Sequence, residues 1–305
     1  WLVSLLGSEV VPFSYAGIDA GRITFGHRCM GTLGPLEVAA PEDYQQLLAD
    51  NFVLIDPIER QSRITDGIEK IELKSGMSVV LDQELLDEVT HLVEYPVPSQ
   101  GTFDEKFLAM PAEVLITSMK YHQKFFAVYD GDKLANQFVV INNTQARDPS
   151  LVVRGNVRVL TARLEDAFFF FKEDCKRPLE EYLEPLGGQT FLKGLGSMRD
   201  KGVRAATLAK SVANLLFDDS RVAETAQRAG TLCKADLATQ MVFEFTELQG
   251  VMGREYARLS KESDEVAEAI FEHYLPRFSG DELPPSPAGA ALALADRLDT
   301  VVGCF

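Results

Sequence analysis

The segment from Phe191 to Arg204 carries the basic side chains best suited to binding phosphate. It reads Phe-Leu-Lys-Gly-Leu-Gly-Ser-Met-Arg-Asp-Lys-Gly-Val-Arg, so four cations stand against the single acid Asp200. A glycine-rich loop that leads into a helix can hold phosphate through free backbone N–H groups and the helix dipole. The candidate phosphate contacts in this segment are Lys193, Arg199, Lys201 and Arg204.

Two interpretations of this segment remain open. The P-loop pattern GxxxxGK[ST] is absent, and no GxGxxG follows a strand, so a nucleotide site has little support. The first interpretation is a linker between domains with a solvated charged face. The second is a contact with the backbone of an RNA, which needs cations but no specific motif.

Two further sets of basic residues have helical spacing. Arg154 and Arg158 are four residues apart, so they share a helical face that can hold phosphates or pair with the neighbouring acids Glu165 and Asp166. Lys120 and Lys124 are also four apart, in the run Lys-Tyr-His-Gln-Lys. A lone histidine such as the one in this run is more often a packing or surface residue than a catalyst.

No pattern of nucleophiles or metal ligands stands out. The four histidines form neither an HxxxH nor an HxH arrangement, and none has a serine or cysteine nucleophile beside it. The four cysteines are widely spaced, which disfavours a disulfide framework or a zinc knuckle and fits a reducing compartment. The sequence therefore predicts no catalytic residue and no bound metal.

Acidic residues do stand inside apolar helical sequence near the C-terminus, at Asp236, Asp296 and Asp299. Such residues are costly to bury unless they are paired or bind a ligand. This half resembles the helical bundle of the His-Asp (HD) metal-dependent phosphohydrolases. In that family an early histidine, a His-Asp pair and a late aspartate bind the metal. The corresponding positions are Lys201, Ala235, Asp236 and Asp296. Two imidazoles are thus missing, and the resemblance implies a degenerate, structural or RNA-binding bundle.

The elements that position these residues follow from hydrophobic periodicity and breakers. In the first part, helices are expected at 57–74, 82–93 and 112–124, and strands at 107–110 and 137–141. Residues 149–185 read as one long helix or two in sequence. After Gly196 strand signals nearly vanish, and helices are expected at 197–217, 220–245, 247–259, 262–275 and 286–302. The fold class is therefore α+β, with a mixed α/β domain over 1–190 and an all-helical domain over 191–305.

Composition limits the function classes. With 30 basic and 46 acidic residues the net charge is −16, which argues against indiscriminate coating of nucleic acid but leaves room for a local basic site. No apolar run is long enough for a transmembrane helix. The chain starts at Trp1 without a signal peptide and stops at Phe305 in apolar sequence, so we expect a fragment of a longer protein.

Several segments together resemble the β subunit of the bacterial two-subunit glycyl-tRNA synthetases. The matching stretches run in the family's order over nearly the whole chain. They are Gly26-His-Arg-Cys-Met-Gly31, Leu92-Val-Glu-Tyr-Pro96, Phe107-Leu-Ala-Met-Pro111, Met119-Lys-Tyr-His-Gln-Lys-Phe-Phe126, Gly155-Asn-Val-Arg-Val-Leu160, Leu164-Glu-Asp-Ala-Phe-Phe-Phe170, the long segment Lys234–Gly253 and Ala293-Leu-Ala-Asp-Arg-Leu-Asp-Thr300.

The resemblance implies a B3/4-like first domain and an HD-like second domain. It implies a non-catalytic, tRNA(Gly)-binding part of a cytoplasmic glycine–tRNA ligase with no membrane association. The partner α subunit would carry the aminoacylation site with ATP and Mg, in an α2β2 holoenzyme. No cofactor is expected in this chain itself. The alternatives are a working HD phosphohydrolase, or editing of aminoacyl-tRNA by the B3/4-like domain.

Overall fold

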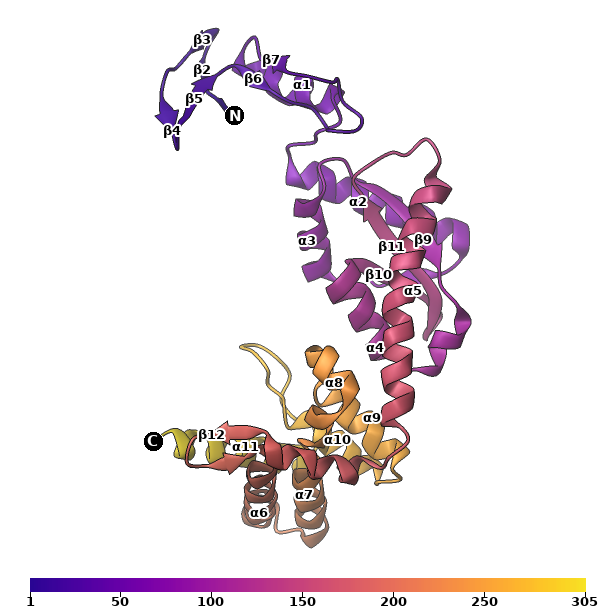
Figure 1. Cartoon of the computed structure of the whole chain (residues 1–305), viewed down its shortest axis with the longest axis vertical. Helices are drawn as coiled ribbons and strands as arrows, with labels where there is room; N and C mark the ends of the chain where they lie inside the picture. The colour runs from indigo at the N-terminus through magenta and orange to yellow at the C-terminus, as the bar shows by residue number, and fades with distance from the viewer. The chain divides into compact units, whose positions relative to one another are not determined.

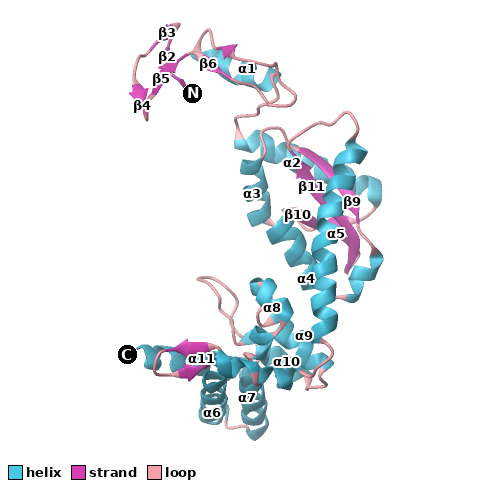
Figure 2. Ribbon diagram, viewed as in Figure 1, coloured by secondary structure: helices cyan, strands magenta, loops and turns pink.

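A computed structural model describes residues 1–305, and they form two compact units, Trp1–Leu164 and Glu165–Phe305. We call these the N-terminal unit and the C-terminal unit. Strands concentrate in the first and helices in the second, as the colouring of Figure 2 shows. The mixed α and β composition agrees with the predicted α+β class. No helix in the chain combines the length and apolar character that crossing a membrane requires.

The N-terminal unit begins with short strands and one helix. The strands β1 (Leu2–Val3), β5 (Ile18–Gly21) and β4 (Ser14–Tyr15) form a small sheet in that order. The strands β2 (Leu5–Leu6) and β3 (Glu9–Val10) pair with each other, as do β6 (Ile23–Thr24) and β7 (Leu36–Glu37). A 3-10 turn at Pro41–Asp43 then leads into α1 (Tyr44–Asp50).

The core of the N-terminal unit is an antiparallel sheet in the order β8 (Ser78–Val79), β10 (Phe125–Asp130), β11 (Lys133–Asn142) and β9 (Val97–Thr102) (Figure 1). The helices α2 (Pro57–Ser75) and α3 (Gln83–Leu92) supply Ile64, Ile68, Leu85, Leu86 and Val89 to one buried cluster with Phe126, Val128, Val139 and Ile141 of the sheet. Both helices form where periodicity predicts them. Asp56 and Asp82 start them by accepting backbone N–H groups of the first turn.

One predicted element in this unit is wrong. Residues 107–110 were expected to be a strand, but Glu105–Ala109 is a 3-10 helix. The Asp104 carboxylate accepts the backbone N–H of Lys106 at 3.0 Å and so stabilises a turn. A short helix α4 (Ala112–Thr117) follows and continues as a π-helical turn over Ser118–Gln123, which ends at Lys124 in the left-handed conformation.

The division between the units falls inside the long helix α5 (Pro149–Asp174), earlier than the expected domain boundary near residue 190. The residues after it belong to the C-terminal unit because they pack there. The Asp174 carboxylate accepts the backbone N–H groups of Gln240 and Met241 at 3.0 and 2.9 Å and the Tyr256 hydroxyl at 3.0 Å. Two 3-10 segments follow α5, at Leu179–Leu183 and Pro185–Gly188.

The C-terminal unit is a helical bundle preceded by the hairpin of β12 (Thr190–Leu192) and β13 (Gly196–Ser197). Its main helices are α6 (Met198–Phe217), α7 (Ser220–Leu232), α9 (Val251–Leu259), α10 (Asp264–Glu272) and α11 (Pro287–Cys304). Small residues let α6 and α7 approach closely. A Cβ on Gly230 would lie 2.6 Å from the Cα of Ala206, so only glycine fits there.

The single helix predicted over 220–245 is interrupted. After α7 the chain forms a 3-10 turn at Ala235–Ala238 and the short helix α8 (Gln240–Glu244). Polar side chains take over the backbone hydrogen bonds at the interruption. The Asp236 carboxylate accepts the backbone N–H of Gly250, and the Thr239 hydroxyl accepts the N–H of Val242 at 3.3 Å to start α8. Another 3-10 turn at Thr246–Leu248 precedes α9.

Candidate functional site

The segment predicted to bind phosphate folds as the β12–β13 hairpin followed by the first two turns of α6. Ser197 and Asp200 form a capping box at the start of the helix. Asp200 accepts the backbone N–H of Ser197 at 2.7 Å, and its own N–H donates to the Ser197 hydroxyl at 3.2 Å. The hydrogen bonds from Ser197 lower the pKa of Asp200. The one acid of the segment is thus used to start the helix.

Lys193 and Arg199 remain available to an outside ligand. Both side chains are exposed, and neither makes an ion pair or hydrogen bond within the protein. Lys193 lies in the turn of the hairpin, next to Gly194 with its positive φ of 93°. These two residues therefore keep the role of candidate phosphate contacts.

Lys201 and Arg204 face inward instead. The Lys201 ammonium lies 3.1 Å from a carboxylate oxygen of Asp296 and 3.3 Å from Asp299, with only 4% of its side chain exposed. Arg204 binds Asp299 through two nitrogens, at 2.6 and 3.1 Å, and donates to the Leu195 carbonyl at 2.8 Å. Both residues therefore belong to an internal ionic network, in which Lys201 is buried and Arg204 is partly exposed, rather than to the set of free candidate phosphate contacts.

Asp296 is the centre of this network. Its Oδ1 faces Lys201, and its Oδ2 lies 3.3 Å from the ammonium of Lys234, whose side chain is only 5% exposed. Burial alone would raise the pKa of Asp296, but the positive charges around it, first that of Lys234, hold the pKa below its usual value. The carboxylate is therefore ionised and shared between two ammonium groups.

His273 completes the buried surroundings of Lys234. Its Nε2 lies 2.8 Å from the Lys234 ammonium, and its Nδ1 lies 2.5 Å from the carbonyl of Ile270. An ammonium can only donate, so Nε2 accepts and Nδ1 carries the proton. Burial, followed by the nearby charge of Lys234, places the pKa of His273 well below its ordinary value. The imidazole is therefore neutral.

Asp236, the second carboxylate of the HD-like positions, is fully buried and performs a different task. Its Oδ2 accepts the backbone N–H groups of Gly250 and Gly253 at 2.6 and 3.1 Å, at the start of α9, while its Oδ1 has no partner. Burial raises the pKa of Asp236 to about 6, against those hydrogen bonds. Ala235 beside it is buried and offers no ligand atom.

Arg154 and Arg158 lie on α5, where both side chains are exposed. Neither makes an ion pair or hydrogen bond within the protein. Their helical spacing of four residues puts them on one face, as the sequence predicts. They form the second pair of available cations.

Lys120 and Lys124 already have acidic partners on or just before α3. Lys120 lies 2.7 Å from Asp82 and 2.9 Å from Glu84, and Lys124 lies 2.8 Å from Glu88. Burial opposes the charge of Lys120, but the hydrogen bonds to Asp82 and Glu84 outweigh it and raise its pKa. Binding of phosphate at these lysines would require breaking the ion pairs first.

Sequence reasoning missed Lys234 and His273 as members of the buried network. Lys234 follows the buried Cys233 and precedes the buried Ala235, so a lysine inside an apolar stretch was the available signal. No comparable signal marked His273, because its contact with Lys234 joins residues far apart in the chain. No group of three or more histidine, cysteine, aspartate or glutamate residues is placed to hold a metal ion.

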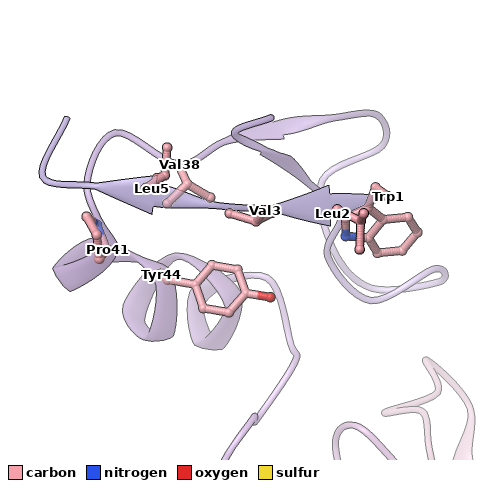
Figure 3. Close-up of a pocket in the computed structure, with 7 residues that line it drawn as sticks. All are labelled: Trp1, Leu2, Val3, Leu5, Val38, Pro41 and Tyr44. Carbon is pink, nitrogen blue, oxygen red and sulfur yellow. The ribbon is translucent and has the colours of Figure 1, made fainter. Parts of the chain in front are cut away.

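The N-terminal unit also has an open pocket of about 390 Å³, lined by Trp1, Leu2, Val3, Leu5, Val38, Pro41 and Tyr44 (Figure 3). These side chains come from the first strands, the loop after β7 and the start of α1. The set contains no acidic, basic, serine or cysteine side chain. It has the chemistry of a packing surface rather than of a reaction site.

Comparison with known proteins adds a family. The whole chain, residues 1–305, matches a family model described as glycyl-tRNA synthetase beta subunit. It is 47% identical over 306 residues to the glycine–tRNA ligase beta subunit of Desulforamulus reducens and 46% identical over 306 residues to that of Geobacter sulfurreducens. The corresponding protein of Limosilactobacillus reuteri is 46% identical over 307 residues. Each alignment covers 100% of this chain and 44% of the relative, so the chain spans less than half the length of these relatives.

Proposed function

The chain belongs to the glycyl-tRNA synthetase beta subunit family, and from this premise we propose that it binds tRNA(Gly) for a glycine–tRNA ligase without containing the aminoacylation site itself. The name of the relatives, beta subunit, implies a partner α subunit. In this proposal the α subunit carries out adenylation and transfer with ATP and Mg, in a cytoplasmic α2β2 enzyme. The present chain holds the acceptor arm.

The observation that carries the tRNA-binding role is the pattern of free and occupied cations. Of the eight basic residues with phosphate-binding potential, Lys201, Arg204, Lys120 and Lys124 have acidic partners. Arg154, Arg158, Lys193 and Arg199 are exposed and form no ion pair or hydrogen bond at contact distance. Cations without acidic partners can neutralise phosphates without first breaking an ion pair, and such contacts position a nucleic acid rather than read its sequence.

The small number of free cations fits the acidic chain. A net charge of −16 disfavours binding to nucleic acid in general, because long-range attraction requires an excess of positive charge. Binding through a few free cations is expected to be weak in this chain alone and stronger together with the α subunit. The logarithm of the binding constant should then fall with the logarithm of the salt concentration with a shallow slope, because only a few phosphates are contacted.

The test is a titration of tRNA(Gly) across salt concentrations, with and without the α subunit. Reversing the charge at Lys193→Glu and Arg199→Glu together is expected to weaken binding at least tenfold and to flatten its salt dependence by about two contacts. Lys261→Glu is the matched control, since Lys261 is also exposed and lies outside the proposed contacts. Unchanged binding by the double variant would overturn the assignment of these residues.

A metal-dependent phosphohydrolase and an editing enzyme are the alternatives. The carboxylate of Asp296 faces two ammonium groups, an arrangement that supports neither metal binding nor hydrolysis at this position. No observation singles out polar groups in the N-terminal unit aimed at a scissile ester. We therefore keep tRNA binding as the proposed function, and hydrolysis of mischarged tRNA by the purified protein would contradict its non-catalytic part.

A further inference from the structure

The HD-like positions of the C-terminal unit can be tested for their fit to a metal ion. Of the four, Lys201 carries a positive charge and Ala235 has no ligand atom. Asp236 uses Oδ2 for the amides of Gly250 and Gly253. Only Asp296 remains as an acidic ligand, and both its oxygens face ammonium groups. A divalent cation needs several convergent donors, so the residues present do not fit one.

The nearby histidine does not restore a ligand set. The lone pair of His273 Nε2 points to the Lys234 ammonium at 2.8 Å, and Nδ1 is engaged with the Ile270 carbonyl. A metal at Nε2 would have to displace a buried lysine, whose charge would repel the metal in surroundings of low dielectric constant. The ammonium of Lys234 therefore occupies the position from which a metal would contact both His273 and Asp296.

We infer that the chain supplies its own cations at this place: the ammonium groups of Lys201 and Lys234 replace a divalent ion and hold the helical bundle together as a structural metal would. The pair carries the charge of one divalent cation. This inference concerns the core of the C-terminal unit and stands whether or not the chain binds tRNA.

The contacts show how the two ammonium groups join the bundle. Lys201 reaches from α6 to α11, where it also donates to the Thr300 hydroxyl at 2.8 Å and to the backbone carbonyl of Asp296 at 3.1 Å. Lys234 reaches from the turn after α7 to Asp296 on α11 and to His273 at the end of α10. Four segments that are far apart in the sequence are thus tied to one carboxylate and its neighbours.

Aromatic rings shield both ammonium groups. Lys201 lies over the ring of Phe191 at 4.5 Å from its centroid, and Lys234 lies at the same distance over the ring of Tyr274. A cation over an aromatic face is stabilised most when water is excluded. The rings therefore help to offset the desolvation of the lysines, and the Phe191 contact connects the β12–β13 hairpin to the network.

The first test measures metal in the purified protein by elemental analysis and its thermal midpoint with and without a chelator such as EDTA. We expect far less than one Zn, Mn, Fe or Mg ion per chain and no change of midpoint with chelator. A stoichiometric metal ion retained through purification, or a midpoint that falls with EDTA, would overturn the inference.

The second test removes one cation at a time. Lys201→Met and Lys234→Met each keep an unbranched side chain of nearly the same length but remove one of the two ammonium partners of the buried Asp296. Each is expected to lower the thermal midpoint by on the order of 10 °C. Lys193→Met is the matched control, because it changes an exposed, unpaired lysine, and we expect its thermal midpoint to equal that of the wild type. Midpoints of the two buried variants equal to that of the control would contradict the inference.

A double variant separates the loss of charge balance from the loss of packing. Lys234→Met combined with Asp296→Leu removes both partners of the Lys234–Asp296 ion pair, while Lys201 keeps Asp299, so the loss of the pair's mutual attraction is counted once rather than twice. We expect the double variant to lose less of the midpoint than the sum of the losses caused by Lys234→Met and Asp296→Leu separately. If the two substitutions were instead simply additive, the stabilisation would not come from the ion pair, and the replacement of a metal charge by lysine would be refuted. This comparison stays informative even where Lys234→Met alone fails to fold.

Discussion

Lys120 in the N-terminal unit and Lys201 in the C-terminal unit each contact two acidic residues at salt-bridge distance, yet their surroundings differ. The partner Glu84 of Lys120 is 78% exposed in its side chain, whereas the partners Asp296 and Asp299 of Lys201 are 17% and 6% exposed. Water and salt screen the first pair and reach the second only poorly. The contacts of Lys120, at 2.7 and 2.9 Å, are even shorter than those of Lys201, at 3.1 and 3.3 Å, so distance alone does not rank the energies, and burial decides which ion pair the fold depends on.

The same contrast occurs within one short segment. Lys193 and Arg199 are free, while Lys201 and Arg204, within eleven residues of Lys193, are bound to aspartates of α11. Position in the fold decides the difference, since Lys193 lies in the turn between β12 and β13 and Arg199 on the exposed side of α6. Lys201 lies on the face of α6 that packs into the bundle, together with the buried Ala205 and Ala209.

The largest effect is expected from removing Asp299. Asp299→Ala takes away the acceptor of two Arg204 nitrogens and one of the acceptors of Lys201, and it leaves the buried Lys201 and the partly exposed Arg204 with excess positive charge. The free energy of unfolding should fall by about 3–5 kcal/mol. Denaturant unfolding measures it, with the exposed Asp132→Ala as control. A loss below about 1 kcal/mol would contradict the claim that the buried ion pairs contribute more to stability than the exposed ones.

Changing pH should separate two buried groups of opposite behaviour. The folded-state pKa of Asp236 is about 6, above its usual value, so its contribution to stability is present at low pH and lost as pH rises from about 4 through 6. The pKa of His273 is lowered, so this group destabilises the fold as pH falls below about 6.5. Between pH 4 and 6, rising pH therefore lowers the free energy of unfolding through Asp236 and raises it through His273.

Asp236→Asn removes the pH dependence of the unfolding free energy that the titration of Asp236 causes. Relative to this variant, the wild type should lose about 3 kcal/mol of unfolding free energy as pH rises through that window. Chemical denaturation at a series of pH values between 4 and 7 gives the difference directly. Parallel curves for the two proteins would show that Asp236 titrates normally and is not in a desolvated site.

A smaller effect is expected at the half-exposed pair. Lys120→Met should lower the free energy of unfolding by about 1 kcal/mol, because solvent screens its bonds to Asp82 and Glu84. Adding salt should reduce this loss, while salt should hardly alter the loss caused by Asp299→Ala. Denaturant titrations at low and high salt measure both. Equal salt sensitivity would contradict the role assigned to burial.

The smallest effect on stability is expected at the free cations of α5. Arg154→Glu with Arg158→Glu should leave the thermal midpoint at the wild-type value, since these side chains have no partner to lose. The same variant should weaken binding of tRNA(Gly) in the proposed function. A variant that has the wild-type thermal midpoint and binds tRNA like the wild type would remove Arg154 and Arg158 from the proposed phosphate contacts.

Much of the local structure was predictable from the sequence. The periodicity of 57–74 and 82–93 gave the helices α2 and α3, and the matching stretches pointed to the family that the comparisons confirm. The predicted secondary structure is wrong at two places, because polar side chains there form hydrogen bonds with the backbone of nearby residues. Asp104 turned the expected strand at 107–110 into a 3-10 helix, and Asp236 and Thr239 interrupted the helix expected over 220–245.

The sequence by itself determined the family, the α+β class and most of the helices, and it supplied the eight basic residues that are candidates for phosphate contact. Only the tertiary structure decided which of those cations remain free. Lys193 and Lys201 look alike in sequence, but α11, almost a hundred residues later, brings Asp296 and Asp299 to one of them. Local sequence encodes helical faces and caps because those interactions span a few residues. The charge state and exposure of a side chain depend on partners that packing alone brings together.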